Sequence, residues 1–275
     1  MEIKSVKCLF FSPTGTTRTI TQHIAEGLQA DQTDMLDCTS LSQRNIEPLT
    51  FKDEIVIIAS PVYYGRLPEK LIPFLKTIRG ENTPVVPVVV YGNREFEDAL
   101  IELYDILADQ GFIPVAGGAF VGEHSYSLPS RPIAQGRPDS NDIEQARFFG
   151  ADIQKKFKSV ISMDGFEKLK VSGSTPYLEP ENLYMLKEVR KTLPFTPETD
   201  MDKCSQCYRC VDVCPTEAVS SADVSAIDRW ECLICFACIK NCPSLAKQMT
   251  DPHFNGAIEH LQQACQERKE PEIFL

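Results

Sequence analysis

The chain has 275 residues, enough for two domains, and its 28 basic and 39 acidic residues give a net charge of −11. This acidic balance, without any block of Lys and Arg, argues against nucleic acid and anionic membrane surfaces as partners. No stretch approaches the ~20 apolar residues of a membrane span. Residues 1–11 also lack the basic region and long apolar run of an export signal, so we expect a soluble cytoplasmic protein.

The first 160 residues alternate short apolar runs with amphipathic segments. The apolar runs predict strands over residues 6–11, 34–38, 55–60, 85–91 and 113–121, several of them apolar on both faces. Helical patterns occupy residues 20–28, 67–78 with Pro68 in the first turn, 96–107 and 142–158. This alternation predicts a doubly wound parallel sheet, which binds ligands at the carboxyl ends of its strands.

Hydroxyl side chains follow the first predicted strand, where the chain turns into a helix. Backbone N–H groups and the positive end of the helix dipole make such a turn an anion site. The segment resembles the flavodoxin phosphate loop, Ser/Thr-x-Thr-Gly-x-Thr, which holds the phosphate of FMN without Lys or Arg. The resemblance implies phosphate contacts from Ser12, Thr14, Gly15, Thr16 and Thr17. The alternative is an ordinary capped helix start that is rich in Ser and Thr.

Two further loops follow the third and fourth predicted strands, at the same edge of the sheet. They resemble the two flavodoxin loops that line the isoalloxazine ring, with Tyr63 or Tyr64 placed to stack on the ring or to edge it. The resemblance implies flavin contacts from Pro61, Val62, Tyr63, Tyr64, Gly65, Gly92, Asn93, Arg94 and Phe96. We expect strand order 2-1-3-4-5, with FMN between strands one and three. This region departs from the family in having no Trp, so the stacking aromatic must be Tyr or absent.

The loop at residues 122–126 follows the fifth predicted strand and is positioned to close over the flavin. It contains His124, and a lone His in a loop is more often a structural residue than a proton donor. After residue 163 the pattern weakens around one possible helix over residues 181–193. The apolar spacing of that helix favours a connector that packs against a core over a free linker.

Eight of the eleven cysteines fall between Cys204 and Cys242, in two runs spaced C-x2-C-x2-C-x3-C-P and offset by 28 positions. In a chain without an export signal this clustering indicates metal ligation and not disulfides. Structural zinc is the alternative, but a zinc site has no use for a third cysteine and a Cys-Pro in both runs. Cys8 and Cys38 are expected to be small buried residues, and Cys265 has no assigned role.

The doubled run resembles that of bacterial two-cluster ferredoxins, in which the fourth cysteine of each run binds the other cluster. The resemblance implies two [4Fe–4S] clusters with crossed ligands. One takes Cys204, Cys207, Cys210 and Cys242, and the other takes Cys232, Cys235, Cys238 and Cys214. The residues between the cysteines are more apolar in the Cys232 run, which predicts the lower reduction potential for that cluster.

In this order the two parts resemble a family of flavodoxin–ferredoxin fusion proteins from anaerobes. The expected fold class is α/β, a doubly wound five-stranded parallel sheet, followed by a small α+β two-cluster ferredoxin-like domain. We expect the flavodoxin-like domain over residues 1–160, a connector over 161–198, the ferredoxin-like domain over 199–250, and a tail over 251–275 with a helix near 255–267.

A flavin exchanges two electrons and each cluster exchanges one, so this combination predicts an electron-transfer protein that serves a redox-protein donor or acceptor. One alternative is an FMN-dependent reductase of a small organic substrate such as a quinone, nitro compound or flavin, fed by the clusters. Another is a binding module in which the iron–sulfur unit is only structural. No G-x-G-x-x-G follows a predicted strand, so we do not expect NAD(P)H oxidation.

Overall fold

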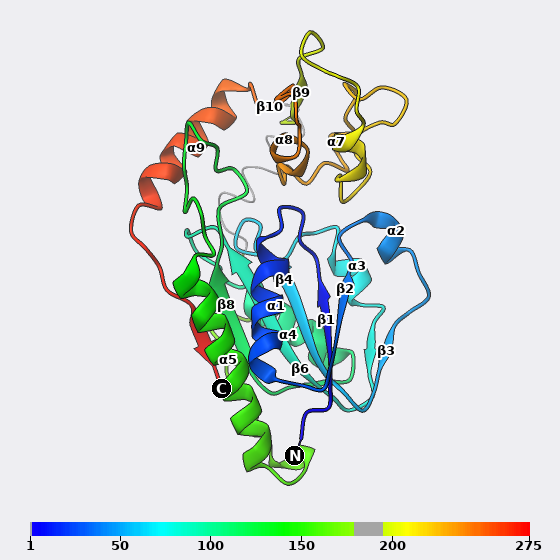
Figure 1. The fold of residues 1–275 in the computed structure, drawn as a ribbon, viewed down its shortest axis with the longest axis vertical. Coiled ribbons are helices and arrows are strands. Elements are labelled where there is room, and N and C mark those ends of the chain that lie inside the picture. Colours follow the sequence, from blue (N-terminus) through cyan, green and yellow to red (C-terminus); the bar gives the residue numbers. More distant parts are fainter. Residues whose placement is uncertain (1, 179–194) are drawn as a thin grey trace.

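The computed structural model describes residues 2–178 and 195–275. The chain forms a larger α/β part, and a smaller cysteine-rich part lies above the carboxyl ends of its strands (Figure 1). The helix expected over residues 181–193 lies outside the described residues.

The central sheet confirms the predicted order of the five parallel strands. Its neighbours run β2 (Gln32–Asp37), β1 (Ser5–Phe10), β4 (Ile55–Pro61), β6 (Thr83–Tyr91) and β8 (Gly117–Val121). The register sets Val6 of β1 against Ile55 of β4, and Val56 of β4 against Val85 of β6. β4 and β6 are buried almost throughout, as central strands between two helical layers should be.

The strand predicted over residues 113–121 is broken into β7 (Phe112–Pro114) and β8, and both pieces pair with β6. Pro114 lies opposite Val85 and Gly118 lies opposite Val88. This part of the chain therefore carries one residue more than β6 does over the same distance. Such an extra residue is a β-bulge, and Pro114 suits it because proline has no N–H for the ladder.

Helices cover both faces of the sheet. α1 (Thr16–Leu28) and α5 (Ser140–Ser159) pack on one face, and α4 (Ala99–Asp109) with the short α3 (Ile72–Leu75) packs on the other. α1 and α5 approach closely, because a Cβ on Gly27 would lie 2.1 Å from the Arg147 carbonyl oxygen and one on Gly150 2.1 Å from that of Ile24. Only glycine allows this backbone contact.

The helix predicted over residues 67–78 is wrong in extent. Pro68 begins a turn in which the Leu71 N–H donates to the Pro68 carbonyl, and α3 starts only at Ile72. Pro73 explains the difference. A proline is tolerated in the first helical turn but not deeper, because it has no N–H to donate, so a helix that contains Pro73 must begin just before it.

The smaller elements complete the α/β part. They are α2 (Leu41–Arg44), a parallel pair formed by β3 (Thr50–Phe51) and β5 (Arg79–Gly80), and a 3-10 turn, η1 (Met163–Gly165). The cysteine-rich part contains α7 (Arg209–Asp212), α8 (Ala237–Lys240) and an antiparallel pair formed by β9 (Glu198–Thr199) and β10 (Lys247–Gln248). Most of its apolar side chains form a cluster of their own, but Leu233, Cys235 and Ala237 belong to the core on the α3 and α4 face of the sheet.

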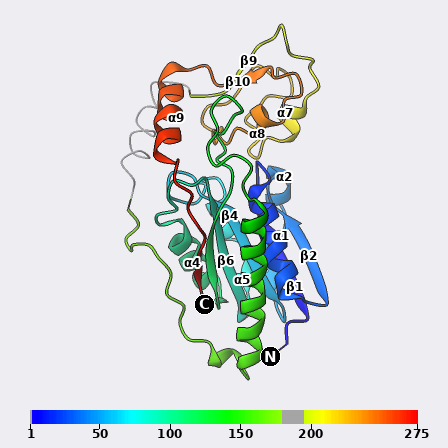
Figure 2. The ribbon, with the colours of Figure 1, turned by 60° about the vertical axis from the view of Figure 1, so that its left-hand side comes forward.

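The C-terminal tail returns to the α/β part. After α9 (Pro252–Ala264), the chain runs down to β11 (Glu272–Phe274), which pairs antiparallel with β8 at the sheet edge (Figure 2). From the sequence we expected a helix near residues 255–267 within a tail over 251–275, and β11 was not predicted. Three residues carry too little alternation to predict a strand, so the exposed edge of β8 decides this pairing.

Candidate functional site: a flavin cavity and two cysteine cavities

The phosphate loop lies between β1 and α1. Gly15, the N-cap residue of α1, has φ +92, a conformation that favours glycine, and has no side chain with which to cap the helix. The Ser12 hydroxyl accepts from the Arg18 N–H at 3.0 Å. The first N–H groups of α1, at Thr16 and Thr17, have no helical partner and stay available to an anion.

A cavity of about 590 Å³ opens beside this loop, at the carboxyl ends of β1, β4, β6 and β8. Ligand cavities commonly range over about 300–1,000 Å³. The predicted flavin contacts that line the cavity are Thr14, Thr16, Pro61, Val62, Tyr63, Tyr64, Gly92 and Arg94. One end of the cavity carries hydroxyls and free amides, which suit a phosphate. The other end carries tyrosines and apolar side chains, which suit a flavin ring.

The remaining predicted flavin contacts do not line the cavity: Ser12, Gly15, Thr17, Gly65, Asn93 and Phe96. Thr17 is buried, and Phe96 packs on Tyr91 with ring centroids 5.5 Å apart. The Asn93 amide nitrogen donates to the carbonyl oxygens of Cys265 and Glu267, at 2.9 and 2.8 Å. Its side chain therefore holds the C-terminal tail.

The cavity also has a wall that the sequence did not indicate. It consists of Phe195 and one side of α9, namely His253, Phe254, Ala257, Ile258, His260, Leu261 and Ala264. The sequence predicted a helix near residues 255–267 but not what that helix covers. α9 thus lies over the flavin cavity, on the side that the α/β part leaves open.

The loop at residues 122–126 lines the cavity, as expected, and contains His124. Burial, followed by the charges of Lys240 and Arg94, lowers the pKa of His124 to about 3. The imidazole is therefore neutral at pH 7. Its Nδ1 accepts from the Tyr126 N–H at 3.1 Å, which assigns the ring proton to Nε2 and gives the side chain a structural hydrogen bond.

The structure brings the eight cysteines together in two small cavities, each with three cysteines of one run and the fourth of the other. The inner cavity is lined by Cys232, Cys235, Cys238 and Cys214, and the outer cavity by Cys204, Cys207, Cys210 and Cys242. Cys235 and Cys238 of the inner cavity are buried, whereas Cys207 of the outer cavity is exposed.

Each cavity presents four thiols from two segments of the chain, and four thiols are the donor set that a four-iron cluster takes. Backbone N–H groups of Ile234 and Ala246 donate to the sulfurs of Cys232 and Cys242, at 3.4 and 3.2 Å. These bonds suit thiolate ligands.

Aromatic side chains separate the flavin cavity from the inner cavity. The ring of Tyr126, which lines the flavin cavity, lies 4.8 Å from the ring of Phe236, which lines the inner cavity. Tyr63, which lines the flavin cavity, packs against the apolar cluster that contains Cys235 of the inner cavity. The inner cavity is therefore the one that adjoins the flavin cavity.

Polar contacts join the two parts of the molecule on several sides. The buried guanidinium of Arg44 donates to the carbonyl oxygens of Cys38 and of Pro215, at 2.9 and 2.6 Å. The Lys240 amino group binds Glu123 at 3.0 Å, and that of Lys70 binds Glu231 at 2.8 Å. These contacts hold the cysteine cavities against the flavin loops.

Two family models match the chain. Residues 8–99 match one described as a flavodoxin domain, and residues 196–243 match one described as a 4Fe-4S dicluster domain. The chain joins a flavodoxin domain to a 4Fe–4S dicluster domain. It is an electron-transfer protein of the flavin and iron–sulfur type, as these two domains together imply.

Flavodoxins of solved structure are similar to the flavodoxin domain. An archaeal flavodoxin is 16% identical and covers 56% of this chain and 99% of its own, with a TM-score of 0.38. The Streptococcus pneumonia TIGR4 flavodoxin is 20% identical (55% and 99% covered, TM-score 0.37). The Fusobacterium nucleatum flavodoxin bound to flavin mononucleotide is 17% identical (56% and 99%, TM-score 0.39). Because these TM-scores are below 0.5, the assignment of the flavodoxin domain rests on the family model and not on these structures.

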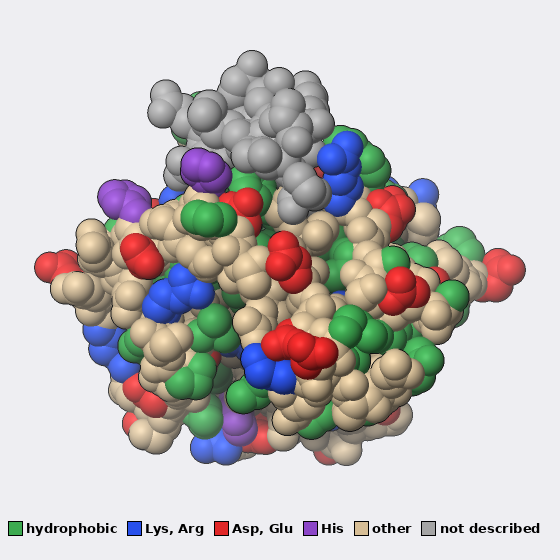
Figure 3. Space-filling view, turned by 90° about the horizontal axis from the view of Figure 1, so that it is seen from above, with side chains coloured by type: hydrophobic (Ala, Val, Ile, Leu, Met, Phe, Trp, Pro, Cys, Tyr) green, Lys and Arg blue, Asp and Glu red, His purple; other side chains and the backbone are tan. Residues whose placement is uncertain are grey.

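In sequence, the chain matches no curated protein. None of the described helices has the length and apolarity that crossing a bilayer requires. Seen from above, the dicluster domain shows acidic side chains interspersed with Lys and Arg on the part of this face that is visible, and no continuous basic patch (Figure 3).

Proposed function

We propose that this protein relays electrons between FMN in the flavin cavity and a one-electron redox protein, through two [4Fe–4S] clusters. The observation that carries the proposal is the lining of the two cysteine cavities. Each combines three cysteines of one run with the fourth of the other, which is the ligand set of a crossed pair of clusters. Bound FMN would supply two-electron chemistry, and each cluster would exchange one electron.

The ligands follow from the cavities. Cys232, Cys235, Cys238 and Cys214 would hold the inner cluster, and Cys204, Cys207, Cys210 and Cys242 the outer one. For FMN, the hydroxyls of Thr14 and Thr16 and the first amides of α1 would bind the phosphate. Tyr63, Tyr64, Gly92 and Arg94 would surround the ring.

The order of the sites supports a linear path. Electron transfer through protein weakens steeply with distance, and the inner cavity meets the flavin cavity at Tyr126 and Phe236. α9 lies over the flavin cavity, while Cys207 of the outer cavity is exposed. A protein partner therefore reaches the outer cluster more easily than the flavin, and the inner cluster connects the two.

The test compares cysteine variants in pairs, on protein purified without oxygen. The wild type should carry FMN and about eight iron and eight acid-labile sulfide per chain. Cys214→Ala should give the same remaining cluster spectrum as Cys235→Ala, because both damage the inner cluster. Cys242→Ala should give the same remaining cluster spectrum as Cys207→Ala, because both damage the outer cluster. Cys8→Ala, which alters a buried cysteine outside both cavities, is the control and should keep both clusters.

The kinetic arm uses the same variants. With the inner cluster lost, FMN should stay bound, but electron exchange between the flavin and an external one-electron partner should slow sharply in stopped-flow measurements. Stoichiometric zinc in place of iron, or a Cys214→Ala spectrum that matches Cys207→Ala, would contradict the cluster assignment. An unchanged exchange rate would remove the dicluster domain from the path.

A further inference from the structure

Apart from Pro197 and Val224, the linings of the inner and outer cavities correspond position by position at the 28-residue offset of the cysteine runs. Ile227 of the inner lining corresponds to Thr199 of the outer one, and Ala218 corresponds to Ala246. The backbone repeats as well, because Tyr208 and Phe236 have φ values of 58 and 60. The two linings differ in charge at one pair of equivalent positions whose side chains are both buried. Val219 of the inner lining corresponds to Lys247 of the outer one.

Lys247 has an unusual environment for a lysine. It lies in β10, is only 3% exposed, and its Nζ donates to the Val224 carbonyl oxygen at 2.6 Å. Within the described residues, no carboxylate forms an ion pair with it. Its charge contributes to the lowered pKa of the exposed Asp223, whose carboxylate lies outside ion-pair distance, and Lys247 lines the outer cavity together with Cys210 and Cys242. Lysine is almost never fully buried unless it is paired, so this position calls for a negative partner.

From this juxtaposition we infer that Lys247 is the buried charge that raises the reduction potential of the outer cluster. Reduction places one extra electron on a cluster, with no bond made or broken. A nearby positive charge in a medium of low dielectric constant stabilises the reduced form. Val219 offers the inner cluster no such charge at the equivalent position. The inference rests on the proposed function, since it requires both clusters.

Other charges near the two cavities do not replace Lys247. Arg209 lines the outer cavity but is exposed, so solvent screens its charge. Arg44 is buried and reaches the Pro215 carbonyl beside Cys214, but its side chain is not part of the inner lining. Because Arg44 adds a cation on the inner side, the test measures how each variant shifts each potential and not the order of the two potentials.

The experiment is a redox titration of the anaerobic holoprotein, followed by electron paramagnetic resonance and with iron and FMN content measured first. Lys247→Met removes the charge at similar length. It should lower the equilibrium constant for reduction of the outer cluster at least tenfold, which is about 59 mV for a one-electron couple. Lys247→Arg should stay within about threefold of the wild type, because the charge is kept.

Val219→Met is the matched control, since it places the same side chain at the equivalent position without changing a charge. It should leave both potentials within about threefold of the wild type. If Lys247→Met lost iron, Lys247→Gln, which keeps a donor for the Val224 carbonyl, should show the same tenfold fall. If Lys247→Met kept its full iron content and the outer cluster kept the wild-type potential, the inference would be overturned. An equal fall in the potential of Lys247→Arg would also overturn it. A wild type without clusters would instead overturn the proposed function.

Discussion

Two hydroxyls mark the phosphate end of the flavin cavity. Thr14 and Thr16 line it, whereas the neighbouring Thr17 is buried. Thr14→Val and Thr16→Val keep the side-chain shape and remove the donor, so each should weaken FMN binding by about 1.5–3 kcal/mol, the usual range for a hydrogen bond to a charged group. Fluorescence titration of the apoprotein measures the loss.

Riboflavin, which has no phosphate, should bind these two variants as it binds the wild type. Thr33→Val, on the exposed surface of β2, is the control and should change neither affinity. If both ligands lost affinity equally, the two threonines would shape the loop or support the ring and would not bind the phosphate.

At the scale of elements, the contact between α1 and α5 depends on two glycines. A Cβ at Gly150 would lie 2.1 Å from the Ile24 carbonyl oxygen, so Gly150→Ala must push the two helices apart. We expect a loss of about 1–3 kcal/mol in the free energy of unfolding, as for other overpacked cores. Denaturant unfolding measures it.

Gly256→Ala in α9 is the matched control, because a Cβ there meets nothing within 4 Å. Alanine is the better helix former, so this change should stabilise α9 by up to about 1 kcal/mol. Two variants with equal unfolding free energies would show that the helix contact tolerates a side chain.

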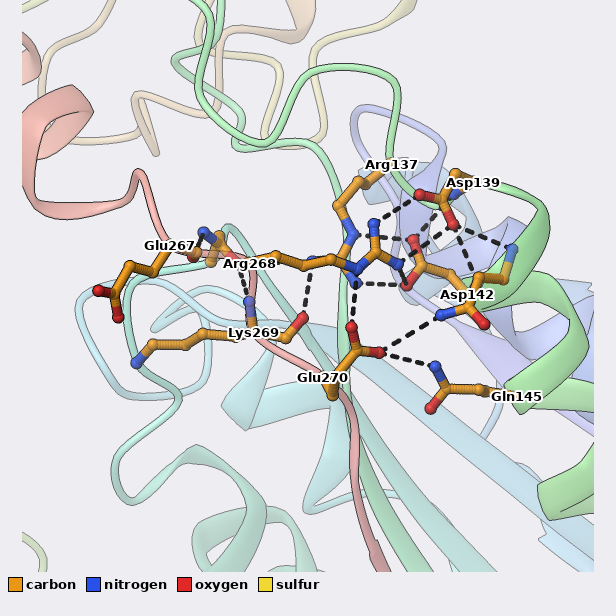
Figure 4. Close-up of polar contacts among 10 residues, drawn as sticks. Arg137, Asp139, Asp142, Gln145, Glu267, Arg268, Lys269 and Glu270 are labelled. Carbon is orange, nitrogen blue, oxygen red and sulfur yellow. Dashed lines mark hydrogen bonds and ion pairs between the residues drawn. The ribbon is translucent and has the colours of Figure 1, made fainter.

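At the scale of the whole molecule, the C-terminal tail fastens the dicluster domain to the flavodoxin domain. Figure 4 shows Arg268 of the tail between Asp139, Asp142 and Glu270, and the buried Arg137 bonds the same Asp142 carboxylate. The Arg268 guanidinium lies 2.6 Å from an Asp139 carboxylate oxygen, and this hydrogen bond is the main cause that lowers the pKa of Asp139.

A lowered carboxyl pKa predicts how this junction responds to acid. Folding favours the ionised form of Asp139, so its contribution is present above the unfolded value of about 3.9 and is lost as the pH falls below it. The protection factors of the β11 amides, which correct for the pH dependence of chemical exchange, should therefore fall below about pH 4. Arg268→Gln should raise the pKa of Asp139 and lower the protection of the β11 amides at neutral pH. The corresponding loss in the free energy of opening should be less than about 1 kcal/mol, because the pair is partly exposed.

The control for the tail is Lys52→Gln, which removes the exposed ion pair with Glu81, a contact within the flavodoxin domain. Its β11 amides should exchange at the wild-type rate. If the β11 amides of Arg268→Gln exchanged at the wild-type rate at neutral pH, strand pairing alone would hold the tail.

The sequence by itself determined those features of this protein that depend only on residues close together in the chain. The cysteine spacing, the hydroxyls between β1 and α1 and the apolar strands could all be read directly, because each depends on neighbours along the chain. The same reasoning failed at residues 67–78, where apolar spacing favoured a helix and Pro73 delayed its start to Ile72.

Only the tertiary structure decided which distant segments share a site. It set α9 over the flavin cavity, turned the Asn93 side chain to the tail, paired β11 with β8 and placed Lys247 in the wall of the outer cavity. Residues 93 and 265 are far apart in the chain, and no local pattern encodes their contact. Such contacts depend on which buried surfaces and unpaired hydrogen-bonding groups meet when the two domains pack, and no short window of sequence contains both partners.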